Sequence, residues 1–268
     1  GRLSAVLNVI SREGNENEFK GKANLSLLSA QTTLEGPFYK GAWVLSGRRT
    51  YFDLVLPKVL PENVATNIPP YYFYDIQSHV FSDITSKDRV SLSYYSGIDD
   101  IIFDTFGLDG RWGNNTISGH YRRVFNERLV GNFLLANSRF FTEFGLGGDY
   151  GLVSFNEIDD ITLSGDFSWF KSSNSTIKFG SQIKRLGFEY TNKFNDSTQF
   201  EIKTDPIEFA NYIKLKYEPN DLLIIEPGLR LNFYNVYPDS LYPDFRLGLK
   251  YILNEDRYLN LSVGNYHQ

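Results

Sequence analysis

The chain has 268 residues, of which 41% are hydrophobic and 16% aromatic, and its formal net charge is −5. The negative charge argues against a nucleic-acid partner, and the absence of cysteine excludes disulfides, thiolate metal sites and cysteine nucleophiles. No window of about 18 consecutive apolar residues occurs, so the sequence does not indicate a helical membrane protein. The mean hydropathy of −0.31 suits a soluble protein, but it also suits a barrel in which apolar residues alternate with polar ones.

Alternation of apolar and polar residues predicts a long series of β-strands. The clearest strand is 243–254, in which Phe245, Leu247 and Leu249 alternate with charged or small residues. Because successive side chains of a strand point to opposite faces, one face of this strand is apolar and the other is charged. In chain order the predicted strands are 18–28, 30–37, 42–55, 71–83, a strand around Val90–Tyr94, 112–125, 129–145, a strand around Ile161–Trp169, 176–194, 207–218, 222–236, 243–254 and a last strand after about residue 256.

One predicted strand, 176–194, loses its regular alternation between Ile183 and Leu186. Two explanations are open at this point. The strand could contain a β-bulge there, or it could leave the membrane there.

The connections between the predicted strands alternate in length. Those near residues 37, 86, 126, 172, 220 and 255 are short, whereas 56–70, 146–153, 195–206 and 237–242 are longer. Outer-membrane barrels have short periplasmic turns and longer outside loops. The pattern therefore predicts an antiparallel transmembrane barrel, with 56–70 and 195–206 outside the cell and the short turns in the periplasm.

The last alternating run, which begins near Leu259, reaches the end of the chain at Gln268. A barrel that stopped there would have two unpaired edges, which a bilayer does not tolerate. We therefore expect the natural protein to continue beyond this residue.

Aromatic residues gather near the ends of the predicted strands. They indicate either interfacial girdles, in which the rings lie at the level of the lipid headgroups, or packing in the core of a sandwich. The nearby turns favour girdles. The residues are Trp43, Tyr51, Phe52, Tyr71, Tyr72, Phe73, Phe140, Phe141, Trp169, Phe170 and Tyr258.

No constellation of residues indicates an enzyme, a metal centre or a cofactor site. His79, His120 and His267 lie on separate predicted strands without the spacing of metal ligands. The pairs Asp99-Asp100 and Asp159-Asp160 are of a type that could bind Ca²⁺ in a loop, but we interpret them as solvated loop charges.

Basic residues on the polar strand faces form a candidate lining of the barrel lumen, accompanied by acidic residues such as Asp166 and Glu208. One interpretation is attraction of an anionic solute. The other is that these groups pair with one another or with a domain that fills the lumen. The basic residues are Lys20, Lys22, Arg122, Lys178, Lys184, Lys214, Lys216, Arg230, Arg246 and Lys250.

The most specific signal lies in the first 55 residues. The segment Leu7–Gly14, with the sequence LNVISREG, is followed by Glu18–Gly21, with the sequence EFKG. These residues resemble the end of the plug domain and the first barrel strand of TonB-dependent outer-membrane receptors. The stretches Leu34–Pro37 and Ser46–Asp53 resemble the early barrel of Bacteroidota-type members.

This resemblance implies an all-β fold with the last plug strand and linker in 1–17 and the N-terminal part of the barrel in 18–268. The chain would hold about 13 of the family's usual strands, which number about 22. The resemblance further implies a location in the cell outer membrane and energy-coupled uptake of a siderophore, vitamin, glycan or peptide. The implied partners are outer-membrane lipid, the inner-membrane TonB complex and the transported ligand, and no catalysis or cofactor is implied.

Two alternatives come from other functional classes, namely a passive porin or adhesin-like barrel and a soluble β-rich structural or carbohydrate-binding domain. Residues 1–14 discriminate between the receptor and the porin. Their apolar residues lack the strict alternation of the wall, and Glu13–Asn17 forms a polar break. We therefore predict that 1–14 lie inside the lumen as part of a plug and do not form a wall strand.

Overall fold

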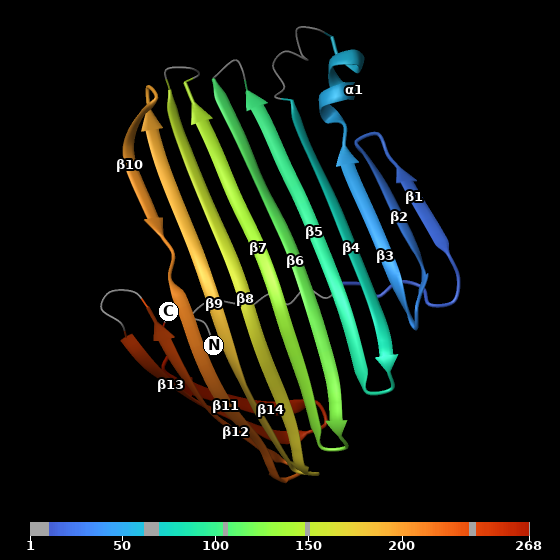
Figure 1. The fold of residues 1–268 in the computed structure, drawn as a ribbon, viewed down its shortest axis with the longest axis vertical. Helices are drawn as coiled ribbons and strands as arrows, with labels where there is room; N and C mark the ends of the chain where they lie inside the picture. Colours follow the sequence, from blue (N-terminus) through green and yellow to red (C-terminus); the bar gives the residue numbers. More distant parts are fainter. Residues whose placement is uncertain (1–10, 62–69, 104–106, 148–150, 236–239, 268) are drawn as a thin grey trace.

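The computed structural model describes residues 11–61, 70–103, 107–147, 151–235 and 240–267. They form one antiparallel sheet in which consecutive strands pair, except that β10 and β11 lie end to end and both pair with β9 (Figure 1). The elements are β1 (Lys20–Leu25), β2 (Ser29–Phe38), β3 (Gly41–Thr50), α1 (Phe52–Val59), β4 (Tyr71–Thr85), β5 (Asp88–Phe103), β6 (Leu108–Asn126), β7 (Leu129–Leu146), β8 (Leu152–Ser172), β9 (Ser175–Phe194), β10 (Ser197–Thr204), β11 (Ile207–Asn220), β12 (Leu223–Tyr234), β13 (Ser240–Asn254) and β14 (Arg257–Gly264).

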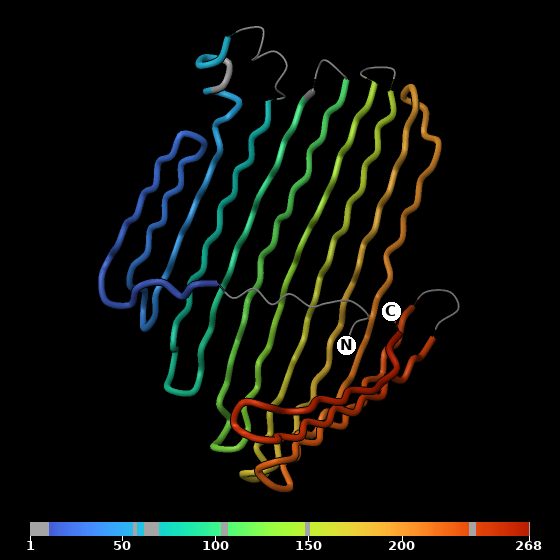
Figure 2. The backbone as a smooth tube through the Cα atoms, turned by 180° about the vertical axis from the view of Figure 1, so that it is seen from behind, coloured from blue at the N-terminus to red at the C-terminus, as the bar shows by residue number. Residues whose placement is uncertain are grey.

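The sheet is strongly curved but is not closed, because β1 and β14 are its two edges. Figure 2 shows it from the concave side, where β12, β13 and β14 curl toward the viewer and residues 11–17 pass in front of the first strands. The predicted all-β barrel wall is therefore confirmed, as an open portion of a barrel. In the described ranges no helix is long and apolar enough to cross a membrane.

Successive hairpins are staggered along the sheet. At the end where the short turns lie, a carbonyl in each of five turns accepts a backbone hydrogen bond of 2.7–2.9 Å from the neighbouring hairpin. Each hairpin therefore reaches further than the one before it, which is the shear that a closed barrel requires. The accepting residues are Lys40, Lys87, Arg128, Asn174 and Leu222.

The segment 195–206 is not the long loop that the sequence predicted. The turn after β9 consists of Asn195 and Asp196, which both have positive φ, 49° and 59°, as a two-residue type I′ hairpin turn requires. β10 then pairs with β9, and β11 continues this pairing in the same register. Residues 197–220 are therefore one long strand interrupted near Pro206, which has no N–H to donate to the ladder.

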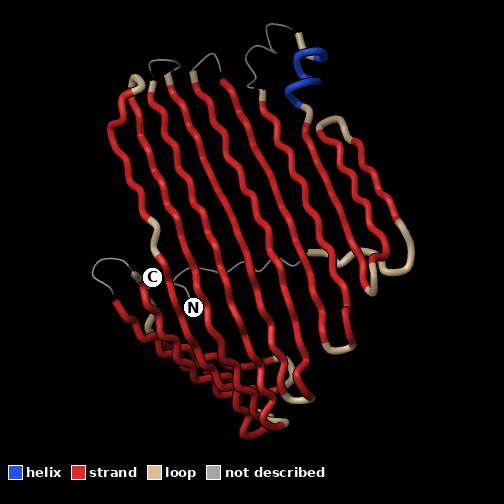
Figure 3. The backbone as a smooth tube through the Cα atoms, viewed as in Figure 1, coloured by secondary structure: helices blue, strands red, loops and turns tan. Residues whose placement is uncertain are grey.

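The strand expected over 42–55 is also shorter than predicted, because β3 ends at Thr50 and α1 begins at Phe52 (Figure 3). Arg49 donates a hydrogen bond of 3.0 Å to Asp53 in the first turn of this helix, where a carboxylate is favoured by the exposed backbone N–H groups. The expected loop 56–70 thus begins within a helix, and its part from 62 to 69 lies outside the described residues.

The alternation break near Ile183 is not a bulge. β8 and β9 pair in one continuous register through this region, with Leu163 opposite Ile183 and Asp160 opposite Leu186. The change in polarity arises because Arg185 lies on the convex face, where it pairs with Asp205 at 2.6 Å. Of the two explanations, the point at which the strand leaves the apolar zone is the one that fits the structure.

The convex face carries an apolar zone with different borders at its two ends. Leu135, Leu163 and Ile183 lie side by side on β7, β8 and β9 and are 59%, 52% and 46% exposed. Toward the short turns, the ring of Phe167 stacks on Phe179, with ring centroids 5.2 Å apart, within a cluster of aromatic residues. A face that exposes this many apolar side chains is suited to contact with lipid.

Ion pairs border the zone at its other end. Arg139 pairs with Glu157 at 2.5 Å on the convex face, and Arg185 lowers the pKa of Asp205 by donating hydrogen bonds to it. Between Trp169 and Asp159 the strand β8 advances ten residues, or about 33 Å at about 3.3 Å per residue. At a strand tilt of about 40° this spans about 25 Å, the height of the apolar band of an outer-membrane barrel.

Facing can be tested with substitutions on one strand. Leu247 lies on the convex face of β13 and Lys250 on the concave face, where the register places it opposite Ile224. An arginine on the lipid face costs about 2–4 kcal/mol near the bilayer midplane. We therefore expect Leu247→Arg to reduce the folded fraction strongly after refolding of the full-length protein into lipid vesicles, as measured by heat-modifiable electrophoresis. Lys250→Leu is the control and should assemble normally, and equal assembly of the two variants would contradict the assignment of faces.

Candidate functional site

The concave face collects the basic residues that were predicted to line the lumen. The register of the strands places all ten on this face. Five of them make ion pairs with carboxylates of the same face or of the adjoining turn. These are Lys20 with Glu18, Lys184 with Asp160, Lys214 with Glu226, Lys216 with Glu218, and Arg230 with Glu208.

A buried polar network lies on β9 to β13. Arg230 donates hydrogen bonds to Glu208 at 2.9 Å, to Gln182 at 3.1 Å and to Asn232 at 2.5 Å. Asn232 in turn donates to Asp244 at 2.9 Å, and both residues are almost completely buried. Because buried polar groups require partners, this network fixes side chains across four strands of the wall.

The network makes a stability prediction. Arg230→Ala removes the guanidinium that pairs with the Glu208 carboxylate. The Glu208 side chain is only 8% exposed. Breaking a buried ion pair from one side costs about 3–5 kcal/mol, so the urea midpoint of unfolding, followed by tryptophan fluorescence, should fall clearly. Lys203→Ala is the matched control, because Lys203 is 72% exposed in its pair with Glu189, and exposed pairs contribute about 0.2–1 kcal/mol. Equal shifts for both variants would show that the network does not stabilise the wall.

The N-terminal segment is attached to the same face. Arg12 donates a hydrogen bond of 2.6 Å to Glu35 on the concave side of β2. Gly14 has φ of 94°, and a Cβ atom there would lie 2.6 Å from the carbonyl oxygen of Trp43. The backbone therefore passes so close to β3 that only glycine is accommodated at this position.

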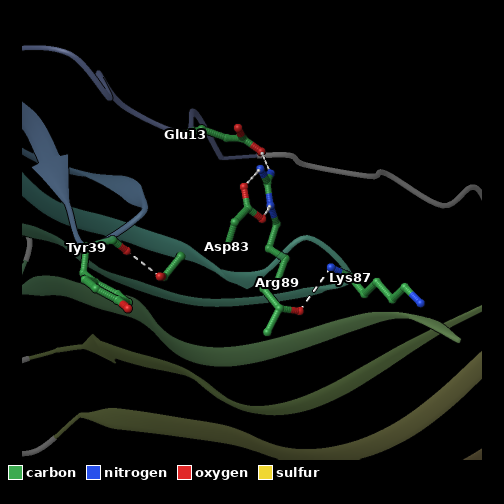
Figure 4. A network of polar contacts seen from close by, with 7 residues as sticks. Glu13, Tyr39, Asp83, Lys87 and Arg89 are labelled. Atoms are coloured by element: carbon green, nitrogen blue, oxygen red, sulfur yellow. Dashed lines mark hydrogen bonds and ion pairs between the residues drawn. The ribbon is translucent and has the colours of Figure 1, made fainter.

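A second attachment follows at Glu13, which accepts a hydrogen bond of 2.9 Å from Arg89 on β5. Arg89 also forms two hydrogen bonds to Asp83, of 2.7 and 2.8 Å, and its guanidinium lies 4.4 Å from the centre of the Phe81 ring. Figure 4 shows this bridge between the segment and the wall. Residues 11–14 thus lie on the concave side, whereas 1–10 lie outside the described residues.

Of these attachment residues, Glu35 was predicted to face the lumen, whereas Arg89 was not among the predicted lumen residues. Arg89 lies on the same face of β5 as Ser91 and Ser93, whereas Val90 and Leu92 lie on the other face. This alternation is visible in the sequence and could have placed Arg89 on the polar face. The contact with Glu13 has no signal in the sequence, because 76 residues separate the partners.

Loss of Arg89 should loosen the segment. An exposed ion pair contributes about 0.2–1 kcal/mol, so Arg89→Gln should increase the open population of residues 11–18 by about 1.4- to fivefold. The measurement is the rate of limited proteolysis in this segment of the full-length protein in detergent, with the cut site located by mass spectrometry. Arg123→Gln is the control, because Arg123 pairs with Asp88 on the convex face. A cleavage rate that Arg89→Gln leaves unchanged would contradict the attachment.

Beside this attachment lies a hollow of about 780 Å³ lined by hydroxyl, amide and imidazole groups. It brings together His79 and His120, which the sequence placed on separate strands, and His79 shares a hydrogen bond of 2.8 Å with Ser93. No group of three metal-ligating residues occurs in the part of the chain that the structure describes. The hollow therefore offers polar contacts to a solute or to another part of the protein.

Two other sequence interpretations need correction. The acidic pairs are not loop charges, because Asp99-Asp100 lie within β5 and Asp159-Asp160 within β8. The aromatic residues do not all form girdles, because the register places Tyr71, Phe73 and Phe140 on the concave face. The convex girdle near the short turns includes Tyr121, Phe125, Phe133, Phe167 and Phe179, together with Trp43 and Trp169 from the predicted set.

These features define the class of structure: part of the wall of an antiparallel transmembrane β-barrel, with a charged concave face and an attached N-terminal segment. No protein-family model matches the sequence, and no curated protein matches it. Solved structures do match in fold.

The copper transporter OprC is 11% identical, with a TM-score of 0.66, and the match covers 91% of this chain and 44% of that one. A variant of the ferric enterobactin receptor PfeA from Pseudomonas aeruginosa is 12% identical, with a TM-score of 0.68, and the match covers 95% of this chain and 44% of that one. The unliganded ferric citrate transporter FecA is 14% identical, with a TM-score of 0.62, and the match covers 95% of this chain and 45% of that one. The chain thus spans less than half the length of these TonB-dependent receptors, and at such identities the likeness shows the fold.

Proposed function

We propose that the chain is part of a TonB-dependent outer-membrane receptor that takes up a ligand by an energy-coupled mechanism. Residues 1–17 would be the end of the plug and its linker, and residues from 18 onward the first part of the barrel. The solved structures of the same fold are named as transporters or receptors for copper, ferric enterobactin and ferric citrate. The sequence stretches Leu34–Pro37 and Ser46–Asp53 support a receptor of the Bacteroidota type.

The observation that carries this proposal is the position of residues 11–14. They lie against the concave face and are held by Arg12–Glu35 and Glu13–Arg89, at 2.6 and 2.9 Å. The convex face of the same wall exposes its apolar residues. A segment that lies in the lumen and then continues into the first wall strand, β1, fits the end of a plug. A simple porin has no role for such a segment.

In the proposed mechanism the ligand binds outside the cell, at the loops and the outer side of the plug. The TonB complex of the inner membrane then pulls on the plug and opens a path along the concave face. The polar hollow beside His79 and the ion pairs on β9 to β13 would border this path. The step is transport across the outer membrane and involves no bond formation or cleavage.

The experiment compares the conductance of two forms of the full-length protein in planar lipid bilayers. The intact receptor should be closed, because a plug fills its lumen. A variant that lacks everything up to Gly14 should form open channels, because the wall from β1 onward no longer holds a plug.

The deletion variant needs evidence of folding, which heat-modifiable electrophoresis supplies. If the intact protein conducts as well as the folded deletion variant, the passive porin is the better interpretation. If neither form inserts into the bilayer and both stay soluble without detergent, the protein is a soluble β-rich domain and the proposal fails.

A further inference from the structure

A second hollow lies on the concave face of β9, β11, β12 and β13, nearer to the short turns. It has a volume of about 350 Å³, which lies within the range of small-molecule sites. Four cationic side chains line it, those of Lys178, Lys214, Arg230 and Arg246, against one carboxylate, that of Glu226. The hollow is therefore strongly basic.

The register explains how the hollow arises. Lys178, Lys214, Gly228 and Arg246 lie opposite one another in a single row that crosses the four strands. Adjacent strands are about 4.8 Å apart, so about 14 Å separate the first Cα of the row from the last. Gly228 has no side chain, and it leaves an open space between the cations on either side of it.

The cations of this hollow differ in how they are neutralised. Arg230 is paired with Glu208, and Lys214 with Glu226 at 2.9 Å. Lys178 and Arg246 make no ion pair with any residue that the structure describes.

Arg246 is the clearest case. Its Nε and one terminal nitrogen, Nη2, are buried and lack an acceptor among the described residues. Its guanidinium lies 5.2 Å from the centre of the Tyr266 ring, which covers it without accepting these hydrogen bonds. Buried guanidinium donors without an acceptor are unfavourable, and a carboxylate or phosphate satisfies them in a planar, bidentate arrangement.

We propose that this hollow binds an oxyanion, a carboxylate or phosphate group of a solute that passes along the wall. The guanidinium of Arg246 would form the bidentate contact once the Tyr266 ring that covers it moves aside. The ammonium groups of Lys178 and Lys214 would add charge from the other side of Gly228. This inference rests on the proposed function, because the solute would be one that the receptor carries along its wall. A carboxylate from the protein's own plug has the same chemistry and is the competing source.

The test uses inorganic phosphate as the probe and the full-length receptor in detergent at constant ionic strength, with binding measured by isothermal titration calorimetry. The wild type should bind phosphate saturably with a stoichiometry of one. Arg246→Gln should weaken binding at least tenfold. Gly228→Val should abolish phosphate binding, because the valine side chain fills the hollow. The wall should tolerate this substitution, since a Cβ at this position makes only ordinary contacts, the shortest 3.6 Å to the Ile213 carbonyl oxygen.

Arg123→Gln is the matched control. Arg123 lies on the convex face, where it pairs with Asp88, so this variant should bind phosphate within twofold of the wild type. All variants should first show the heat-modifiable mobility of a folded barrel.

Two results would overturn the inference. A wild type without saturable phosphate binding would show that no free oxyanion site exists, as expected if a plug carboxylate fills it. Equal binding by all three variants would place the phosphate elsewhere. Both results leave the conductance test untouched, so a receptor that is closed when intact and open without its plug would keep the proposed function while losing this site.

Discussion

The constraint on which the structure depends is that the backbone must pair strand to strand. A bilayer supplies no hydrogen-bond partners, so each N–H and C=O within it needs one from a neighbouring strand. The long ladders of β5 to β9 meet this requirement with registers that shift only beside the short turns. The same registers decide which face each side chain takes, since a slip of one residue would exchange the lipid face and the lumen face. Within the apolar zone, the restriction of charge to one face is therefore a consequence of the pairing.

The concave face is divided between two kinds of surface. On β4 to β6 it carries hydroxyl and imidazole groups together with Arg89, which holds the N-terminal segment. On β9 to β13 it carries a denser set of charges, in which the buried Glu208 pairs with the half-buried Arg230. The contrast matters because neutral polar groups make exchangeable contacts, whereas buried ion pairs fix the strands in place.

The strands and their facing could be predicted because both depend on a local pattern of period two. Leu163 and Asp166, for example, lie on the faces that the alternation indicates. The strand around 197–204 was missed because Pro206 and a polar composition suggested a loop, while the pairing with β9 that creates it is not local. Partners such as Glu13 and Arg89 could not be predicted, since curvature alone brings them together. The sequence predicted which basic residues face the lumen. It could not predict which of them pair with a carboxylate, because that depends on the residues that lie opposite one another across four strands.

The wall and the segment inside it are held by forces of very different strength. Each wall strand is bound to its neighbours by a ladder of backbone hydrogen bonds and by side-chain contacts on both faces. Residues 11–14 are held chiefly by two ion pairs, in which Arg12 is 67% exposed and Glu13 55%. Pairs this exposed contribute about 0.2–1 kcal/mol each and weaken further in salt. A modest force can therefore displace the segment while the ladders stay intact, which is the mechanical asymmetry that a barrel with a removable plug requires.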